Sequence, residues 1–148
     1  MSTDASVTKD LLQTLEDGKA GFAKGAEKLT DSDSPELAAT FRKYSEERAG
    51  FIAELEELAK TYGDDIEESG TVTGTLHRGW LAVKDALAGA DPSGVLDAAE
   101  QGEDHAVTVY EKALTEDLSA GLREVVVRQA TAVQAAHDDV RALRDTLG

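Results

Sequence analysis

The amino-acid sequence predicts an all-α protein, a bundle of four long helices with a short helix between the second and the third. Apolar residues recur at spacings of three and four along four long segments, which is the period of an amphipathic helix. These segments lack the alternation of β-branched residues that is typical of strands. Both prolines, Pro35 and Pro92, follow a residue that can cap a helix, Ser34 and Asp91, as expected where proline takes the first helical position.

Length and composition indicate a single domain. At 148 residues the chain can bury a proper core. We expect residues 1–5 to form a disordered tail and residues 6–148 to form the bundle. The chain has no cysteine, which excludes disulfides and thiol chemistry. No basic region followed by an apolar run marks a signal peptide, and no stretch approaches the roughly 18 apolar residues of a membrane span. A cytoplasmic location is therefore expected.

The charge balance is strongly acidic, with 15 basic and 30 acidic residues and a net charge of −15. Nucleic acids and anionic membranes attract basic surfaces, so neither is an expected partner. The acidic residues are spread along the chain, which favours a well-solvated surface over a site for one cationic partner.

The first two long helices are predicted at about 6–30 and 35–62. Gly18, Gly21 and Gly25 fall inside the first, where glycine weakens a helix, and they indicate that another backbone packs closely there. The second helix carries a stripe of large apolar residues: Leu37, Phe41, Tyr44, Phe51, Leu55, Leu58 and Tyr62.

The rest of the chain reads as a loop at 63–70, a short helix at about 72–88, and long helices at about 92–115 and 119–147. The loop is rich in glycine and acidic residues. Tight turns near 31–34 and 116–118 make two antiparallel hairpins. A short helix of this length covers about 25 Å, so with its loops the middle connection can run back along the second helix. The second and third long helices would then be parallel, which is the ferritin-like connectivity. The alternative is a plain five-helix array.

Polar residues interrupt three of the apolar stripes. Arg48 lies near the centre of the stripe of 35–62, Glu103 is centred on that of 92–115, and Gln129 is central on that of 119–147. If the helices are parallel and start level, Arg48 and Glu103 differ in height by about 3 Å, and Gln129 comes near the same layer. We expect a buried polar core of these three residues. The alternative is that Arg48 extends along the stripe and reaches the rim.

Several segments together resemble a known family. They are Asp17–Phe22, Tyr44–Arg48, Ser69–Thr71, His77–Trp80, Glu100–Asp104 and His137–Asp138. The chain resembles an uncharacterised bacterial family of ferritin-like four-helix bundles, a domain of unknown function, over about residues 8–145. The resemblance implies the ferritin-like fold and brings no established activity.

A metal centre is the main alternative to a closed polar core. A ferritin-like di-iron site uses a Glu from each of two helices and Glu-x-x-His from each of the other two. The chain offers Gln134 with His137, and Glu100 with Glu103, so the ligand set is incomplete. Iron or another divalent metal could still be held at a smaller site by these four residues. No metal and no other cofactor is the simpler expectation.

A second possible site lies on the short helix. Trp80 is most simply its apolar anchor, although His77 and Lys84 beside it could line a small pocket. No catalytic grouping and no glycine-rich phosphate loop stands out. The sequence therefore predicts a non-enzymatic structural or stress-related bundle that forms a homo-oligomer, a dimer in the simplest case. The alternative function is a metal-binding redox or storage protein.

Overall fold

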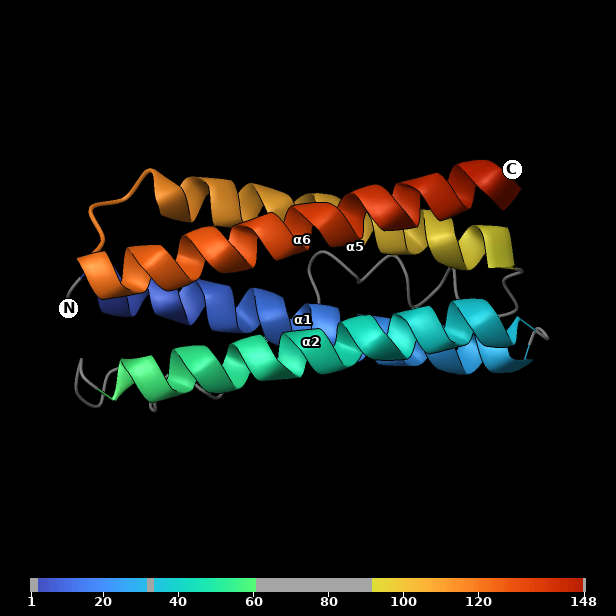
Figure 1. Cartoon of the computed structure of the whole chain (residues 1–148), viewed down its shortest axis with the longest axis horizontal. Coiled ribbons are helices and arrows are strands. Elements are labelled where there is room, and N and C mark those ends of the chain that lie inside the picture. The colour runs from blue at the N-terminus through green and yellow to red at the C-terminus, as the bar shows by residue number, and fades with distance from the viewer. Residues whose placement is uncertain (1–2, 32–33, 61–91, 148) are drawn as a thin grey trace.

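The computed structural model describes residues 3–31, 34–60 and 92–147, and these residues form four helices (Figure 1). They are α1 (Thr3–Asp31), α2 (Pro35–Ala59), α5 (Pro92–Leu114) and α6 (Ala120–Leu147). Every described element is a helix, so the all-α prediction is confirmed for this part of the chain. None of the described helices has the length and the apolar composition needed to cross a membrane.

The helix limits differ from the prediction at the N-terminus. α1 begins at Thr3, and Ala5 is buried, so residues 3–5 belong to the helix and not to the expected tail. The buried Ala5 methyl packs near Ala59 and Leu12, which explains why the helix continues to this point. The loop predicted at 63–70 and the short helix predicted at 72–88 lie outside the described residues.

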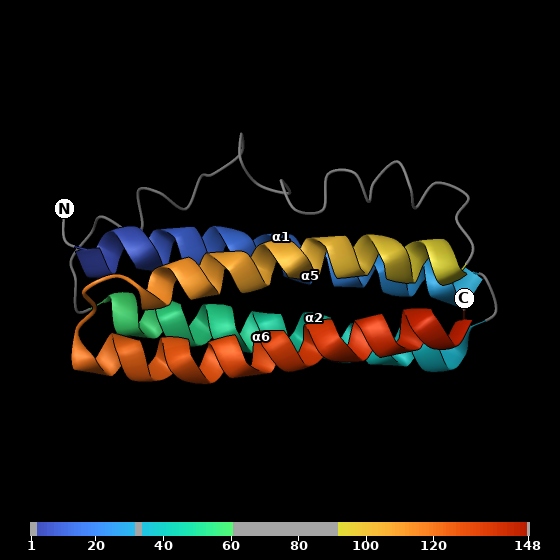
Figure 2. The same ribbon diagram turned by 90° about the horizontal axis from the view of Figure 1, so that it is seen from above.

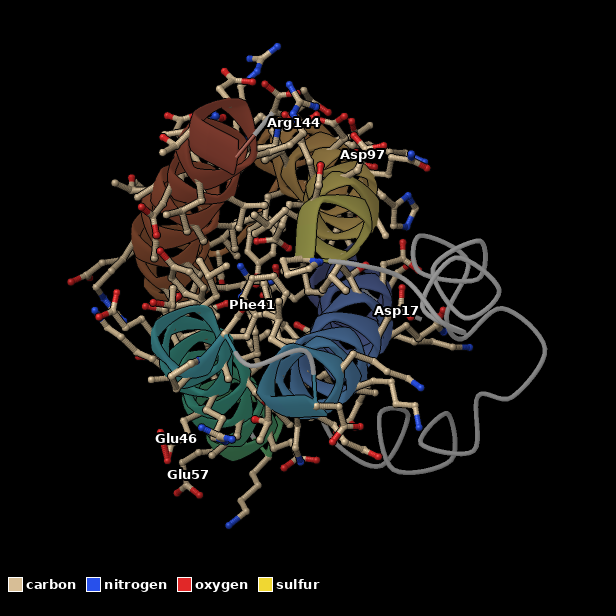
Figure 3. All side chains as sticks on the ribbon, turned by 90° about the vertical axis from the view of Figure 1, so that its right-hand side faces the viewer. Asp17, Phe41, Glu46, Glu57, Asp97 and Arg144 are labelled. Atoms are coloured by element: carbon tan, nitrogen blue, oxygen red, sulfur yellow. The ribbon has the colours of Figure 1, made fainter. Side chains whose placement is uncertain are left out.

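The four helices form two antiparallel hairpins, α1 with α2 and α5 with α6 (Figures 1 and 2). α2 and α5 run in the same direction, so the end of α2 and the start of α5 lie at opposite ends of the bundle. In the end view of Figure 3 the helices stand at the corners of a square, with α1 beside α2 and α5, and α6 completing the square. α5 packs closely on α1, whereas α2 and α6 approach each other at few points.

Two large apolar clusters fill most of the interior. One lies toward the α1–α2 turn and contains Phe22 and Phe41, which meet edge to face at 5.2 Å between ring centroids. The other lies toward the α5–α6 turn and contains Leu11, Leu55 and Leu122. Figure 3 shows Phe41 pointing into the space between the helices. The division of the core matters because the layer between the two clusters holds the polar residues described below.

The helix ends show which predicted caps are made. Proline takes the first position of α2 as expected, but the Ser34 side chain makes no capping hydrogen bond, so the prediction of a serine cap is wrong. At the opposite end of the bundle, the Asp4 carboxylate accepts a hydrogen bond of 3.0 Å from the Ser119 backbone N–H just before α6. Arg123 donates to the carbonyl oxygens of Leu114 and Glu116 at the end of α5. Such contacts satisfy backbone groups that a helix end leaves unpaired.

The glycines of α1 make room for side chains. A Cβ at Gly18 would lie 3.0 Å from Nη1 of Arg48, and one at Gly25 would lie 2.7 Å from the Phe41 ring. At both positions the nearest atoms are therefore side chains, and not those of the second backbone that the sequence predicted. Two large side chains of α2, one charged and one aromatic, fill the space where a larger residue on α1 would have stood.

Candidate functional site

The centre of the bundle is a salt bridge between two helices of different hairpins. Arg48 on α2 and Glu103 on α5 both have 0% of their surface exposed. Arg48 Nη1 donates to one carboxylate oxygen of Glu103 at 2.9 Å, and Nη2 donates to the other at 2.5 Å. The structure therefore contains the buried pair that the stripe positions predict, and Arg48 does not reach the rim.

The pair lies in the gap between the two apolar clusters. On α2 the cluster residues stop at Tyr44 and resume at Phe51, and on α5 they stop at Ala99 and resume at Ala106. Arg48 and Glu103 each fall in the middle of such a gap. A buried charge is costly unless it is paired and hydrogen-bonded, and Arg48 and Glu103 meet this requirement for each other.

The surroundings of Arg48 favour its charged form. Burial alone would lower the pKa of Arg48, but the charge of Glu103 and the two hydrogen bonds to it outweigh that effect and raise the pKa. The guanidinium carbon lies 5.3 Å from the centroid of the Phe22 ring, within the range of a cation–π contact. Gly18 closes the site from α1. The third donor of the group, Nε, is buried without a hydrogen-bond partner.

Gln129 belongs to a second polar layer. It is fully buried, as predicted, but it makes no hydrogen bond to either member of the salt bridge. Its side-chain oxygen accepts from the Tyr110 hydroxyl at 2.8 Å, and its nitrogen donates to Glu54 at 2.9 Å. Tyr110 follows Glu103 by seven residues, which is about two helical turns. The prediction of one layer containing all three residues is therefore wrong, because Gln129 bonds to residues further along the same two helices, Tyr110 on α5 and Glu54 on α2.

The second layer continues to the surface. Glu54 accepts two hydrogen bonds from the guanidinium of Arg128, one of them at 3.1 Å. The hydrogen bond from Arg128 is the main reason why the pKa of Glu54 is lowered. At the buried end of this chain of hydrogen bonds, burial raises the pKa of Tyr110, so its hydroxyl keeps its proton and remains a donor to Gln129.

The four candidate metal ligands do not meet. Glu103 is bound by Arg48 at both oxygens, and Glu100 pairs with Arg144 and, at 3.4 Å, with Arg141. Gln134 is exposed and donates to Asp138 at 3.0 Å. Within residues 3–31, 34–60 and 92–147, no group of three or more His, Asp or Glu side chains has a geometry that could hold a metal ion.

The fourth candidate, His137, is also committed elsewhere. It is 7% exposed and lies between two aspartates, with Nε2 at 2.6 Å from Asp104 and Nδ1 at 3.2 Å from Asp138. Burial would lower the pKa of His137, but the hydrogen bonds to Asp138 and Asp104 outweigh it and raise the pKa. These residues therefore do not fit a ferritin-like di-metal centre, because arginines or aspartates already engage the side chains that such a centre would need.

The contacts between helices that were not predicted include two that join α6 to its neighbours. Asp104 is the α5 partner of His137, and the Tyr44 hydroxyl donates to Asp139 at 2.5 Å, joining α2 to α6. Each had a signal in the sequence. Tyr44 lies on an apolar stripe, where a tyrosine hydroxyl usually finds a partner, and Asp104 directly follows the buried Glu103. The candidate pocket residues His77, Trp80 and Lys84 lie outside the described residues.

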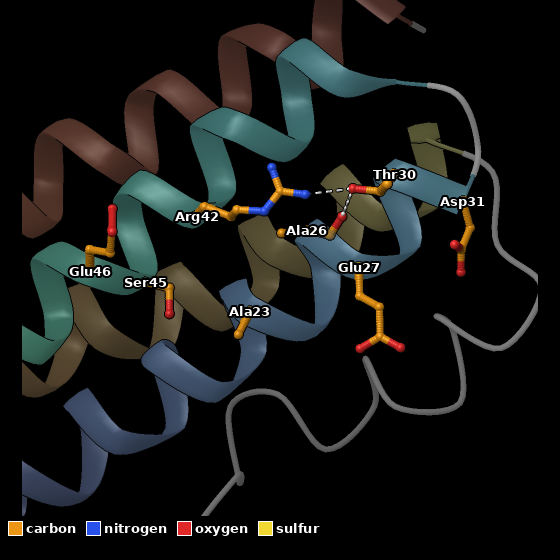
Figure 4. Close-up of a pocket in the computed structure, with 8 residues that line it drawn as sticks. All are labelled: Ala23, Ala26, Glu27, Thr30, Asp31, Arg42, Ser45 and Glu46. Carbon is orange, nitrogen blue, oxygen red and sulfur yellow. Dashed lines mark hydrogen bonds between the residues drawn. The ribbon is translucent and has the colours of Figure 1, made fainter.

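A groove on the outside of the α1–α2 hairpin has a volume of about 510 Å³ (Figure 4). Its rim carries the carboxylates of Glu27, Asp31 and Glu46. Arg42 crosses it and donates to the Thr30 hydroxyl at 2.8 Å. The described lining contains no histidine and no serine–base pair, so it offers acidic side chains and hydrogen-bonding groups without a catalytic arrangement.

The fold and the buried salt bridge thus define a helical bundle with a polar centre and apolar ends. Residues 5–116 match the model of a family described as a domain of unknown function, DUF2383. The match covers more than half of the chain, which therefore belongs to this family. It includes α1, α2 and α5, and with them both members of the salt bridge, and it ends in the turn before α6. A comparison with curated proteins finds no match.

Proposed function

We propose that this protein is a non-enzymatic, ferritin-like helical bundle with a structural or stress-related role, in which a salt bridge takes the place of a reactive centre. The observation that carries the proposal is the closed geometry of that pair. Both oxygens of Glu103 accept hydrogen bonds from Arg48, and neither residue is exposed to solvent. A general acid, a nucleophile or a metal ligand must reach its reaction partner, and neither residue can.

The ferritin-like part of the proposal is supported by the course of the chain. α2 and α5 are parallel, so the end of α2 and the start of α5 lie at opposite ends of the bundle (Figure 1). Ferritin-like bundles have one long crossover of this kind between two antiparallel hairpins. In the di-metal members of that class, carboxylates from all four helices point inward, whereas here α2 contributes the buried Arg48 to the interior.

The proposal also includes a cytoplasmic homodimer. The glycines at 18, 21 and 25 are buried in the bundle, so the glycine-bearing face of α1 is not available for the contact between subunits. Light scattering on the purified protein across a concentration series gives the oligomeric state directly. A constant monomer mass would remove the dimer from the proposal without affecting the rest of it.

Metal content separates this proposal from its rival, a metal-binding redox or storage protein. The protein should be purified without chelator and without an affinity tag that binds metal, and then submitted to elemental analysis. We expect far less than one iron, zinc or manganese per chain. One or two equivalents that survive dialysis and disappear in a Glu103→Gln variant would contradict the proposal and favour the rival.

A further inference from the structure

The groups around Arg48 have the composition of a receptor for a planar cation. Glu103 supplies two parallel acceptor oxygens at 2.9 and 2.5 Å from Nη1 and Nη2, the fork-to-fork geometry that suits a guanidinium and a carboxylate. Phe22 presents its ring 5.3 Å from the guanidinium carbon. The cation is thus held by two charge-assisted hydrogen bonds and lies over an aromatic ring.

The receptor is assembled from three helices. Gly18 and Phe22 come from α1 and Glu103 comes from α5, while Arg48 enters from α2. A Cβ at Gly18 would lie 3.0 Å from Nη1, so the pocket is fitted to the size of the guanidinium. Arg48 carries the cation, and Gly18, Phe22 and Glu103 lie around it.

We propose that Gly18, Phe22 and Glu103 form a binding site for a guanidinium ion, which the chain fills with its own Arg48. The site would accept a free guanidinium ion once the Arg48 side chain is shortened to alanine. The free ion would take the place of the Arg48 head group, donate two hydrogen bonds to Glu103 and lie against Phe22.

The described contacts favour a planar ion over a spherical one. A divalent cation such as Mg²⁺ or Ca²⁺ needs about six or more oxygen ligands, whereas the only carboxylate that hydrogen-bonds to the guanidinium is that of Glu103. An ammonium ion would have the charge but would not match the fork of two acceptors. The selectivity expected for the emptied site is therefore guanidinium over ammonium and over divalent metals.

The experiment measures thermal unfolding of the Arg48→Ala variant by circular dichroism while guanidinium chloride is added up to about 50 mM, a concentration at which its denaturing action is small. Urea at the same concentrations has the same planar shape without the charge, and sodium chloride controls for ionic strength. Ammonium and magnesium chloride test selectivity. We expect guanidinium alone to raise the unfolding temperature of Arg48→Ala by several degrees and to saturate, and to leave the wild-type protein unchanged.

Two further variants keep the result decisive. Arg48→Met leaves Glu103 without its partner but fills the space, and Arg48→Ala with Glu103→Gln has the space but not the charge; neither should respond to guanidinium. If Arg48→Ala is unfolded in buffer, guanidinium should restore its helical signal while urea does not. The proposal would be overturned if guanidinium had no effect on Arg48→Ala, whether that variant is folded or unfolded. It would also be overturned if either control variant responded equally, or if ammonium or magnesium had an equal effect. Metal content of the wild-type protein is a separate measurement, so this proposal can fail independently of the proposed function.

Discussion

Among the residues that the structure describes, two arginine–glutamate pairs join the two hairpins, and they differ in little except burial. Arg48 binds Glu103 across α2 and α5, with 1% and 0% of the two side chains exposed, and Arg128 binds Glu54 across α6 and α2, with 56% and 32% exposed. Both pairs have two hydrogen bonds between fork and carboxylate. Because the two pairs share the same residue types and the same number of hydrogen bonds, comparing them shows the effect of burial on an ion pair.

The environment decides how each pair affects stability. A buried pair has lost its hydration, so its net contribution is modest while both partners are present, but removal of one partner leaves an uncompensated charge in the core. An exposed pair is hydrated before and after the change and is screened by salt. The buried pair therefore specifies which helices meet and at which level, while the surface pair adds to an arrangement that is already fixed.

The largest effect is expected from Arg48→Leu. The substitution leaves the Glu103 carboxylate in the core without a donor, and the free energy of unfolding should fall by about 3–5 kcal/mol. Equilibrium unfolding in urea, followed by circular dichroism, measures the change. A loss below about 1 kcal/mol, within the usual range for substitutions at uncritical surface positions, would show that the pair does not have the buried geometry described here.

The double variant Arg48→Leu with Glu103→Leu should recover much of that loss, because it removes both charges and leaves apolar side chains between two apolar clusters. Replacement of a buried ion pair by apolar residues is often neutral or stabilising. The four proteins of this double-mutant cycle, with Glu103→Leu as the second single variant, give the coupling energy by urea unfolding. Additive losses would mean that the two side chains act independently.

A smaller effect is expected from Gly18→Ala, which tests how tightly α1 closes on the pair. Its Cβ would lie 3.0 Å from Nη1 of Arg48, a group held in place by Glu103, whereas a Cβ at the exposed Gly50 would meet nothing within 4 Å. Gly50→Ala is thus the matched control and should stabilise the helix by about 0.5–1 kcal/mol. Relative to it, Gly18→Ala should be less stable by about 1–3 kcal/mol, the usual cost of overpacking. Equal changes in the two urea curves would mean that Arg48 can move aside.

The sequence predicted the direction in which side chains point better than it predicted which residues they contact. The reason is that long side chains can reach partners at another level of the bundle. Helix periodicity predicts direction around an axis, and this was enough to find the four helices and to place Arg48 opposite Glu103. It says little about how far a long side chain reaches along the axis. Gln129 faces inward as predicted, yet it bonds to Tyr110 and Glu54 and not to the nearest predicted partner.

The glycines of α1 also show that a sequence pattern does not identify the group that makes a contact. Their spacing predicted close packing, and packing is close at Gly18 and Gly25, but the neighbours are an arginine and a phenylalanine. A glycine pattern cannot distinguish a backbone from a large side chain as the filler, because both need the same missing Cβ. His137, like Gln129, was identified as a polar residue near an apolar stripe. Its partner Asp104 was not predicted, because periodicity does not show which residues of two neighbouring helices come into contact.

The pH dependence of stability tests the contact between His137 on α6 and Asp104 on α5. Because the folded-state pKa of His137 is raised above its ordinary value of 6.5, its imidazolium stabilises the folded protein fully below about pH 6.5. This contribution is lost as the pH rises through the raised folded-state value. His137→Gln should remove that decrease, so the difference in urea midpoint between wild type and variant should shrink from pH 6 to pH 9. A constant difference over this range would show that the imidazole does not titrate between Asp104 and Asp138.

The smallest effect is expected from Arg128→Leu, and it completes the comparison of the two pairs. Glu54 keeps its hydrogen bond from Gln129 at 2.9 Å and remains partly hydrated, so loss of the guanidinium leaves no buried charge. The urea midpoint should shift by little more than the experimental error at physiological ionic strength, and the small difference from wild type should vanish at 1 M salt, where the screening length is about 3 Å. The Arg48→Leu loss should persist at that salt concentration, because bulk ions do not enter the core. If both variants lost the same stability, or if salt abolished both losses, burial would not be what distinguishes the two pairs.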